Sequence, residues 1–231
     1  MTSPSGHLDE RFSPVAHSAT FNRILDTLGL RAKKILDMGC GYGEYLVCFG
    51  TGSVGVTTTP AQVEYGVEKG IAIIRGNVEL IDELALAKDF QGLWANNLFE
   101  HLLAPHAFLI KLKTISAPDA VLVLGVPVVP KIASLMKVPK FRGALATAHI
   151  NFFTRETLRL TVERAGWKVQ TVRPFIFSNI YLDWLCSFVA PHLYVVAYND
   201  PTFTYHIKKV IEWQDDAHYD KVLAIAGPRA H

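Results

Sequence analysis

The stretch that most constrains this chain is residues 34–45, which read Lys-Ile-Leu-Asp-Met-Gly-Cys-Gly-Tyr-Gly-Glu-Tyr. A short apolar run ends in glycines at alternate positions, Gly39, Gly41 and Gly43. Because glycine lacks a Cβ, the backbone there can adopt left-handed angles and let a ligand approach closely. We expect a buried strand, a ligand-binding loop, and a helix whose free N–H groups favour a carboxylate or phosphate. Asp37, at the end of the strand, offers an acceptor for an amine or hydroxyl.

This stretch resembles the first motif of class I S-adenosylmethionine-dependent methyltransferases, a hydrophobic strand that ends in Asp-x-Gly-x-Gly-x-Gly. The resemblance implies an α/β fold: a Rossmann-like, doubly wound, seven-stranded and mostly parallel sheet with an antiparallel edge strand and helices on both faces. It also implies S-adenosylmethionine as cofactor and S-adenosylhomocysteine as product, with Asp37, Gly39, Cys40 and Gly41 at the cofactor. The dinucleotide fingerprint fits less well, since its third glycine comes one residue later and an acidic residue follows about 20 positions on. The next strand here ends at Thr57 instead.

Composition agrees with one α/β domain and excludes some functions. The chain has 231 residues, half of them apolar, which is enough for a large core around a buried sheet. Its net charge is +2 and its basic residues are scattered, so we expect no nucleic-acid partner. The three cysteines and the absence of C-x-x-C and H-E-x-x-H predict reduced thiols in a cytoplasm and no metal site. The longest apolar region, residues 175–198, is interrupted by polar residues and is too broken to span a membrane.

Patterns of apolar and turn residues divide the chain into three parts. We expect a flexible lead-in over residues 1–16, a methyltransferase domain over 17–199 and a C-terminal extension over 200–231. Residues 131–148, which are basic, and 175–190, which are rich in aromatic residues, are candidate acceptor-side insertions; an ordinary solvated loop and core packing are their plainer interpretations. The predicted strands after the first are residues 53–56, 71–74, 91–95, 120–126, 167–173 and 192–198, the last being the antiparallel strand. The predicted helices include residues 17–30, 44–49, 105–115 and 154–165.

The end of the second strand departs from the usual family pattern. Most class I methyltransferases have an acidic residue there that holds the ribose of the cofactor, whereas this chain has Thr57 and Thr58. The resemblance therefore implies that Thr57, Thr58 and Gln62 contact the ribose, more weakly than a carboxylate would. The plainer alternative is that the threonines only cap the next helix, which Thr59 would begin.

Two further segments match family motifs. After the third strand, Asn77 and Val78 stand where the family meets the adenine, although Asn77 also suits an ordinary turn. After the fourth strand, the run Asn-Asn-Leu-Phe-Glu-His-Leu from Asn96 is similar to the fourth motif of the superfamily. Because parallel sheets bind ligands outside the carboxyl ends of their strands, we expect Asn96 to face the methionine part and the transferable methyl group.

Histidines supply the candidate bases. His101 follows the fourth strand and His149 follows the fifth, so either could take a proton from a hydroxyl acceptor. The alternatives are that His101 holds the loop after the fourth strand and that His149 braces the turn before Thr154. Glu100 is a weaker candidate, because position is all that supports it.

The predicted function is methyl transfer from S-adenosylmethionine to a small molecule, with an oxygen acceptor preferred over carbon or nitrogen. A sugar hydroxyl, a phenol or quinone precursor and a lipid-like chain remain open as acceptors. Two alternatives stand beside it: a cofactor-binding protein without turnover, and an NAD-dependent oxidoreductase. The oligomeric state, monomer or homodimer, is also open.

Overall fold

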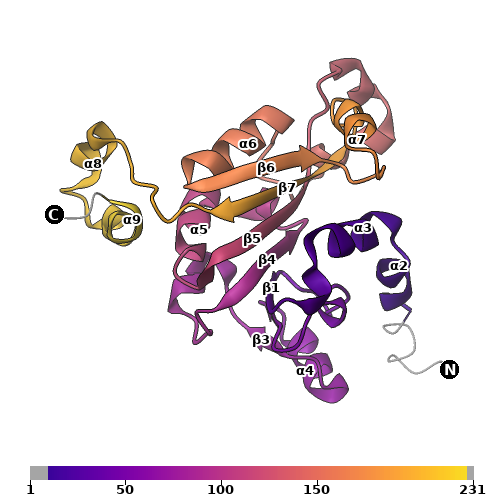
Figure 1. Cartoon of the computed structure of the whole chain (residues 1–231), viewed down its shortest axis with the longest axis horizontal. Helices are drawn as coiled ribbons and strands as arrows, with labels where there is room; N and C mark the ends of the chain where they lie inside the picture. The colour runs from indigo at the N-terminus through magenta and orange to yellow at the C-terminus, as the bar shows by residue number, and fades with distance from the viewer. Residues whose placement is uncertain (1–9, 228–231) are drawn as a thin grey trace.

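The computed structural model describes residues 10–227, in which seven strands form one sheet with the order β3-β2-β1-β4-β5-β7-β6 (Figure 1). The pairs among β1 to β5 are parallel, and β7 is antiparallel to both of its neighbours. This arrangement confirms the predicted Rossmann-like α/β class. The strands are β1 (Ile35–Met38), β2 (Val54–Thr57), β3 (Ile73–Arg75), β4 (Phe90–Asn96), β5 (Ser116–Pro127), β6 (Trp167–Arg173) and β7 (His192–Asn199).

The antiparallel strand is not at the edge of the sheet, which corrects that detail of the prediction. β7 lies between β5 and β6, so β6 is the edge strand. The residues from Leu193 to Ala197 are all buried, and such a continuous apolar run needs layers on both faces of the sheet. An inner position satisfies this need and leaves the more polar β6, with exposed Lys168 and Gln170, at the edge.

Helices cover both faces of the sheet (Figure 1). One face packs against α5, α6 and α9, and the other packs against Phe21, Ile24 and Leu25 of α3. The α-helices are α2 (Phe12–Ala16), α3 (Ala19–Leu28), α4 (Pro60–Lys69), α5 (Pro105–Leu112), α6 (Arg155–Arg164), α7 (Ile180–Cys186), α8 (Ile207–Trp213) and α9 (Asp220–Ala226). Short 3-10 turns are η1 (Leu30–Ala32), η2 (Leu46–Cys48), η3 (Val78–Glu83), η4 (Phe99–His101), η5 (Ala133–Lys137), η6 (Pro139–Phe141), η7 (Gly143–Leu145) and η8 (Ala217–Tyr219).

The helix predicted over residues 44–49 is wrong, because only the 3-10 turn η2 forms there. The segment between the glycine loop and β2 is too short for a helix. Gly43 still has a left-handed φ of 92°, and by Gly50 the chain has turned toward β2, where the Gly50 N–H donates to the Lys33 carbonyl at 3.0 Å. One 3-10 turn has too few aligned peptides to attract an anion. The ligand affinity of the glycine loop must therefore come from its backbone and side chains.

The other helix boundaries follow their sequence signals closely. Ser18 caps α3 by accepting from the N–H of Phe21, and Gly29 ends that helix with a φ of 62°. Thr154 begins α6 in a capping box with Thr157, as expected. Thr59 stands at the N-cap of α4 but makes no side-chain cap; the hydroxyl of Thr57 accepts from its N–H at 3.2 Å instead.

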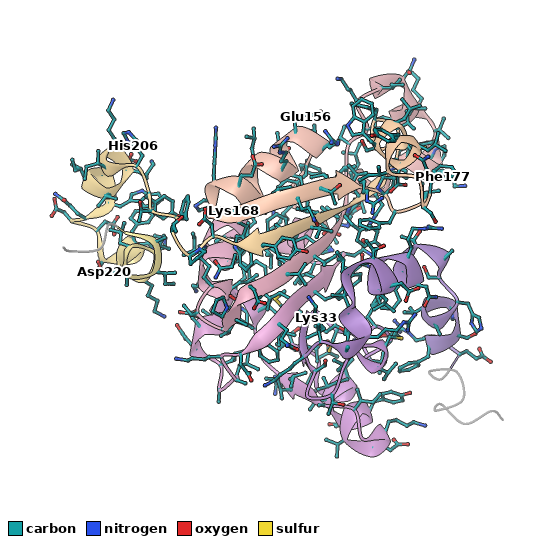
Figure 2. All side chains as sticks on the ribbon, viewed as in Figure 1. Lys33, Glu156, Lys168, Phe177, His206 and Asp220 are labelled. Carbon is teal, nitrogen blue, oxygen red and sulfur yellow. The ribbon has the colours of Figure 1, made fainter. Side chains whose placement is uncertain are left out.

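The C-terminal part of the described chain, from residue 200 to 227, packs on the same face as α5. The Tyr205 hydroxyl lies 2.7 Å from Nε2 of His106 in α5, and Val222 and Ala226 of α9 belong to the main core. In Figure 2 the labelled His206 and Asp220 lie at the opposite end of the molecule from Phe177, which precedes α7. The predicted lead-in lies partly outside the described residues, and its described part contains α2.

Candidate active site

A cavity of about 300 Å³ lies at the carboxyl ends of β1 and β4, next to the glycine loop. β1 contributes Asp37, β4 contributes Trp94 and Asn96, and the segment around α2 closes the cavity with Arg11 and Val15. This is the place where open parallel sheets bind their ligands. The full lining is Arg11, Val15, Asp37, Gly39, Cys40, Gly41, Glu44, Tyr45, Trp94, Asn96 and Asn97.

The glycine loop needs its glycines for two reasons. Gly39 and Gly41 have φ angles of 72° and 60°, which side chains with a Cβ rarely adopt. A Cβ on Gly41 would also lie 2.8 Å from Oε2 of Glu44, which accepts a 3.0 Å hydrogen bond from the N–H of Tyr42. The loop is thus folded around the Glu44 side chain, and its bare backbone faces the cavity.

Two acidic side chains and one basic side chain set the charge of the cavity. Asp37 is buried and its Oδ2 has no hydrogen-bond partner among the described residues. Burial, with the nearby Glu44 carboxylate, raises the pKa of Asp37 well above its usual value. Glu44 itself pairs with Arg11, whose Nε lies 2.8 Å from its Oε1. A buried acceptor without a partner is costly, so a cationic donor group from a ligand would satisfy Asp37.

Cys40 lies in this cavity as a protonated thiol. Burial and the Asp37 carboxylate raise its pKa above the normal range, and its Sγ lies 3.6 Å from the carbonyl of Gly41. A thiol that resists ionisation is a poor nucleophile. Cys40 therefore contributes shape to the loop and does not supply a reactive group.

The remaining predicted cofactor residues lie outside the lining of this cavity. Thr57 is buried at the end of β2 and its hydroxyl bonds to the Gln62 side chain, while Thr58 is exposed. Asn77 accepts from the N–H of Glu79 at 2.9 Å and so caps η3, and Val78 is buried beside it. The structure therefore brings Asp37, Gly39, Cys40, Gly41 and Asn96 together, and leaves Thr57, Thr58, Gln62, Asn77 and Val78 at the ends of β2 and β3.

A polar corner that the sequence did not reveal lies at the ends of β4 and β7, the two strands that flank β5. The Asn96 amide donates to the Tyr45 hydroxyl at 3.0 Å, and Nε2 of His192 lies 3.1 Å from Oδ1 of Asn97. Asn97 has a left-handed φ of 53°, a conformation that non-glycine residues adopt at a cost. Burial lowers the pKa of His192 to about 4, so its ring is neutral at pH 7.

His192 reaches this corner because β7 runs antiparallel to β5. The register pairs His192 with Pro127, so the first residue of β7 lies at the carboxyl end of β5, on the ligand-binding edge of the sheet. In the sequence His192 only opens an apolar strand. One signal could have identified His192: it is the first residue of the predicted antiparallel strand. In a mostly parallel sheet, the first residue of an antiparallel strand lies beside the carboxyl ends of the parallel strands.

The two predicted bases, His101 and His149, lie close to each other but do not line the cavity. Their ring centroids are 4.7 Å apart, and their Nε2 atoms lie 3.9 and 3.8 Å from Oε1 of the fully buried Glu100. Burial raises the pKa of Glu100, and the His101 and His149 rings act in the opposite direction. The structure therefore joins these three candidates into a separate cluster.

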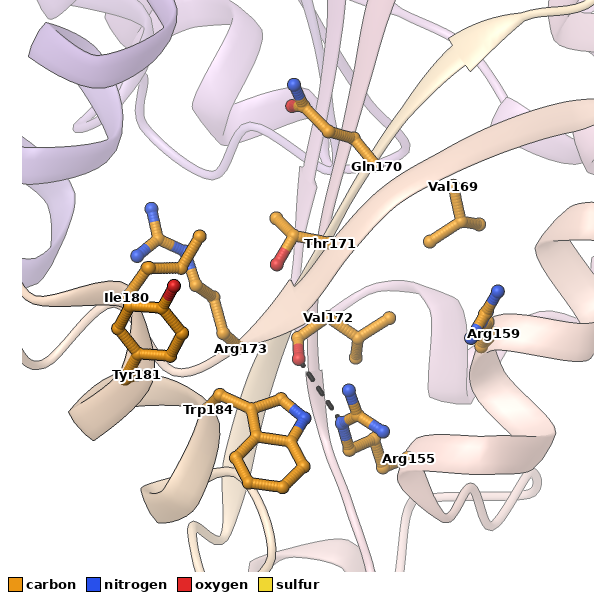
Figure 3. Close-up of a pocket in the computed structure, with 10 residues that line it drawn as sticks. All are labelled: Arg155, Arg159, Val169, Gln170, Thr171, Val172, Arg173, Ile180, Tyr181 and Trp184. Atoms are coloured by element: carbon orange, nitrogen blue, oxygen red, sulfur yellow. Dashed lines mark hydrogen bonds between the residues drawn. The ribbon is translucent and has the colours of Figure 1, made fainter.

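A larger cavity, of about 610 Å³, lies between the edge strand β6, α6 and α7 (Figure 3). Trp184 and Tyr181 from α7 face Arg155 and Arg159 from α6 across it, and Arg155 donates to the Val172 carbonyl at 3.3 Å. It shares no lining residue with the cavity at the glycine loop. The predicted insertion over residues 175–190 thus forms one wall of a second cavity.

A sheet of this strand order, with a glycine loop, a buried Asp37 and an asparagine at the end of β4 around one cavity, defines a class I S-adenosylmethionine-dependent methyltransferase. A sequence model described as a methyltransferase domain matches residues 10–172, and the chain belongs to that family. It is an enzyme of this type, and its cofactor is S-adenosylmethionine. No functionally curated protein matches the chain in sequence.

Solved structures share this fold at low sequence identity. A Thermotoga maritima methyltransferase, described as a possible histamine N-methyltransferase, is 15% identical with a TM-score of 0.57, over 85% of this chain and 96% of that one. An Archaeoglobus fulgidus S-adenosylmethionine-dependent methyltransferase is 17% identical with a TM-score of 0.57, over 80% and 96%. One from Mesorhizobium loti is 15% identical with a TM-score of 0.59, over 80% and 100%.

In the part of the chain from residue 10 to 227, no helix is both long enough and apolar enough to cross a membrane.

Proposed function

We propose that this enzyme methylates a hydroxyl group of a small molecule. The observation that carries the proposal is the neutral His192, which bonds to Asn97 in the lining of the cavity that contains Asp37. Its low pKa keeps the imidazole unprotonated at pH 7, and a hydroxyl acceptor needs such a group to take its proton. Carbon and amine acceptors need no base in principle, so with them the neutral His192 would have no role in the reaction.

We further propose which residues contact each part of S-adenosylmethionine. Asp37 accepts from the ammonium group of the methionine part of the cofactor, and the Gly39–Gly41 backbone lies against that methionine part. Arg11, now paired with Glu44, is the cation available to the methionine carboxylate. Thr57, Thr58 and Gln62 hold the ribose, Asn77 and Val78 meet the adenine, and Asn96 faces the methyl group. When bound, S-adenosylmethionine supplies an electrophilic methyl group that is already activated by positive charge.

The role of His192 as base depends on which of its two ring nitrogens has a free lone pair. A carbonyl oxygen can only accept, so Nε2 of His192 donates its hydrogen to Oδ1 of Asn97, and Nδ1 keeps a lone pair. Nδ1 then takes the proton from the acceptor hydroxyl as the methyl group is transferred. His101 and His149 remain predicted bases, but His192 stands first because it bonds to Asn97 of the cavity lining, whereas the ring bonds of His101 and His149 among the described residues go to Ala148 and Ala144.

The acceptor chemistry is supported by the walls of the cavity. Trp94 packs with Tyr45 and Phe21 at ring distances of 5.4 and 5.3 Å and with Tyr194 at 6.0 Å, which makes an aromatic surface under the polar corner. Of these rings, Trp94 and Tyr45 line the cavity, and their surface beside its polar groups suits a small, partly apolar molecule such as a phenol. A nucleic-acid substrate is not part of the proposal. We place the enzyme in the cytoplasm, in keeping with its three free cysteines.

Two measurements test the proposal. Titration calorimetry with S-adenosylmethionine, S-adenosylhomocysteine and NAD in parallel should show binding of the first two alone. Transfer of a labelled methyl group is then followed with phenol, sugar and lipid-like acceptors, and with amine analogues of the same shape. Turnover should require the hydroxyl and should fall in His192→Gln while cofactor binding stays unchanged. Equal turnover with amine analogues in both proteins would exclude the hydroxyl acceptor.

A further inference from the structure

The cluster of Glu100, His101 and His149 combines side chains from two separate segments. Glu100 and His101 belong to η4, just after β4, and His149 lies in the loop before α6. One ligand atom from each of the three residues can be chosen so that all lie within 4.8 Å of one another. None of the three residues lines the cavity at the glycine loop. The active site described above therefore does not account for this cluster.

Backbone contacts fix the tautomer of both rings. Nδ1 of His101 lies 3.0 Å from the Ala148 carbonyl, and Nδ1 of His149 lies 3.3 Å from the Ala144 carbonyl. Because a carbonyl only accepts, each Nδ1 must carry the hydrogen. In the neutral rings Nε2 then keeps its lone pair, and both Nε2 atoms face Oε1 of Glu100. A histidine whose Nδ1–H donates to a carbonyl while Nε2 is free is the usual form of a metal ligand.

Glu100 supplies the second observation. Its side chain is only 1% exposed, and neither of its carboxylate oxygens has a hydrogen-bond partner among the described residues. The two Nε2 atoms lie too far away to donate to it even if they were protonated. An isolated carboxylate at this depth is strongly unfavourable unless a cation approaches it. With both rings neutral, two Nε2 atoms and one carboxylate oxygen thus direct three lone pairs toward a shared space.

The two segments are held together without help from the cluster. The carbonyl of Glu100 accepts from the N–H groups of Ile150 and Asn151 at 3.1 and 3.0 Å. The Asn151 amide also donates to the Leu102 carbonyl at 2.6 Å. These bonds place His149 beside Glu100 in advance, so an ion would meet ligands that already lie near their final positions.

We propose that Glu100, His101 and His149 bind a divalent transition-metal ion, with Zn²⁺ as the best match. Two imidazole nitrogens and one carboxylate oxygen are a known ligand set for catalytic zinc. An ion at about 2.0–2.1 Å from each atom in tetrahedral geometry would bring the ligand atoms to about 3.4 Å apart. The present nitrogen–oxygen separations of 3.8 and 3.9 Å need only a small side-chain rotation to close.

Such a site would have an open coordination position. Three protein ligands leave the fourth position of Zn²⁺ to water or to an oxygen of another molecule. His101 is 38% exposed on its side chain and His149 only 13%, so access is from the His101 side. The ion would also tie the loop that carries η7 to η4. The proposal does not depend on a hydroxyl acceptor or on His192 as base.

Metal binding can be measured directly on the full chain after treatment with a chelator. Co²⁺ is titrated and followed by its visible absorption, and Zn²⁺ is then added in competition. We expect one Co²⁺ per chain, displaced by Zn²⁺. The variants E100Q, H101A and H149A should each weaken binding by at least about 100-fold, since loss of a direct ligand exceeds the 10–100-fold effect of losing an outer partner. The exposed His206 provides a control, and His206→Ala should bind as the unmodified chain does.

S-adenosylmethionine affinity, measured on the same proteins, reports whether each variant is folded. E100Q keeps the shape of the side chain, so it tests ligation even if a histidine variant fails to fold. The proposal is overturned if the unmodified chain binds neither ion at pH 7.5. It is also overturned if folded E100Q, H101A and H149A keep full affinity, or if the Co²⁺ spectrum shows thiolate ligation and so binding at a cysteine.

Discussion

Oδ1 of Asn96 occupies the space into which a Cβ on Gly125 would project. The same Cβ would lie 2.6 Å from Cε1 of Tyr194 and 3.0 Å from Cε1 of His192. Gly125, in the middle of the ligand-facing half of β5, is therefore the residue that allows the polar corner of the active site to assemble. We expect Gly125→Ala to lower turnover by about 100-fold, because it displaces positioned groups by an ångström or so.

The stability of Gly125→Ala should fall by about 1–3 kcal/mol, the usual effect of overpacking, so the protein should remain folded. Turnover is measured beside chemical denaturation. Gly143→Ala is the matched control, since a Cβ there meets nothing within 4 Å. Turnover of Gly125→Ala equal to that of the control would show that the corner takes no part in catalysis.

Asp37→Asn should separate stability from function. Burial and Glu44 disfavour the Asp37 carboxylate, as its raised pKa reflects, so the neutral amide should leave the free protein as stable or more stable by about 1 kcal/mol. Loss of the charged acceptor should weaken S-adenosylmethionine binding by about 1.5–3 kcal/mol. Calorimetry and thermal unfolding measure the two effects, with the exposed Asp215→Asn as control. Unchanged affinity would remove Asp37 from cofactor binding.

The features that could be predicted from the sequence are those encoded locally. Gly39, Gly41 and Gly43 have the positive φ angles expected of them, and Thr154 caps α6, because both depend on a few adjacent residues. The alternation of strands and helices then defines the parallel part of the sheet. The predicted helix after Gly43 failed because local pattern does not show how soon the chain must return to β2.

The features that were missed depend on pairing between distant segments. His192 reaches Asn97 only because β7 inserts beside β5, and Arg11 reaches Glu44 only because α2 packs over the glycine loop. Glu100 and His149 stand far apart in the chain, and main-chain bonds bring them together. A motif search over short spacings finds none of these contacts.

Thr57 and Gln62 form a side-chain pair at the end of β2, and this pair gives the ribose prediction a sharper test. The Thr57 hydroxyl donates to Oε1 of Gln62 and accepts from Thr59, so the amide hydrogens of Gln62 remain for a ligand. We expect the double variant Thr57→Ala, Gln62→Ala to weaken S-adenosylmethionine binding by roughly 1–3 kcal/mol in calorimetry. The exposed Thr51→Ala serves as control. An effect close to zero would return both residues to the role of holding the start of α4.

His192 should make the enzyme sensitive to acid in a defined way. The folded protein protonates His192 only near pH 4, whereas an unfolded chain does so near its usual value of 6.5. Between these pH values the unfolded state binds more protons, so the free energy of unfolding falls as the pH falls. This contribution reaches roughly 3 kcal/mol by pH 4. His192→Gln lacks it and should lose less stability on acidification than the unmodified chain.

The measurement for His192 is chemical denaturation of both proteins from pH 7.5 to 4. Asp37, whose pKa is raised, acts in the opposite direction, but it is present in both proteins and cancels in their difference. His218→Gln, at an exposed position, should follow the unmodified chain throughout. Parallel curves for His192→Gln and the unmodified chain would mean that the ring is not buried as described. His192 would then not be a neutral base at pH 7.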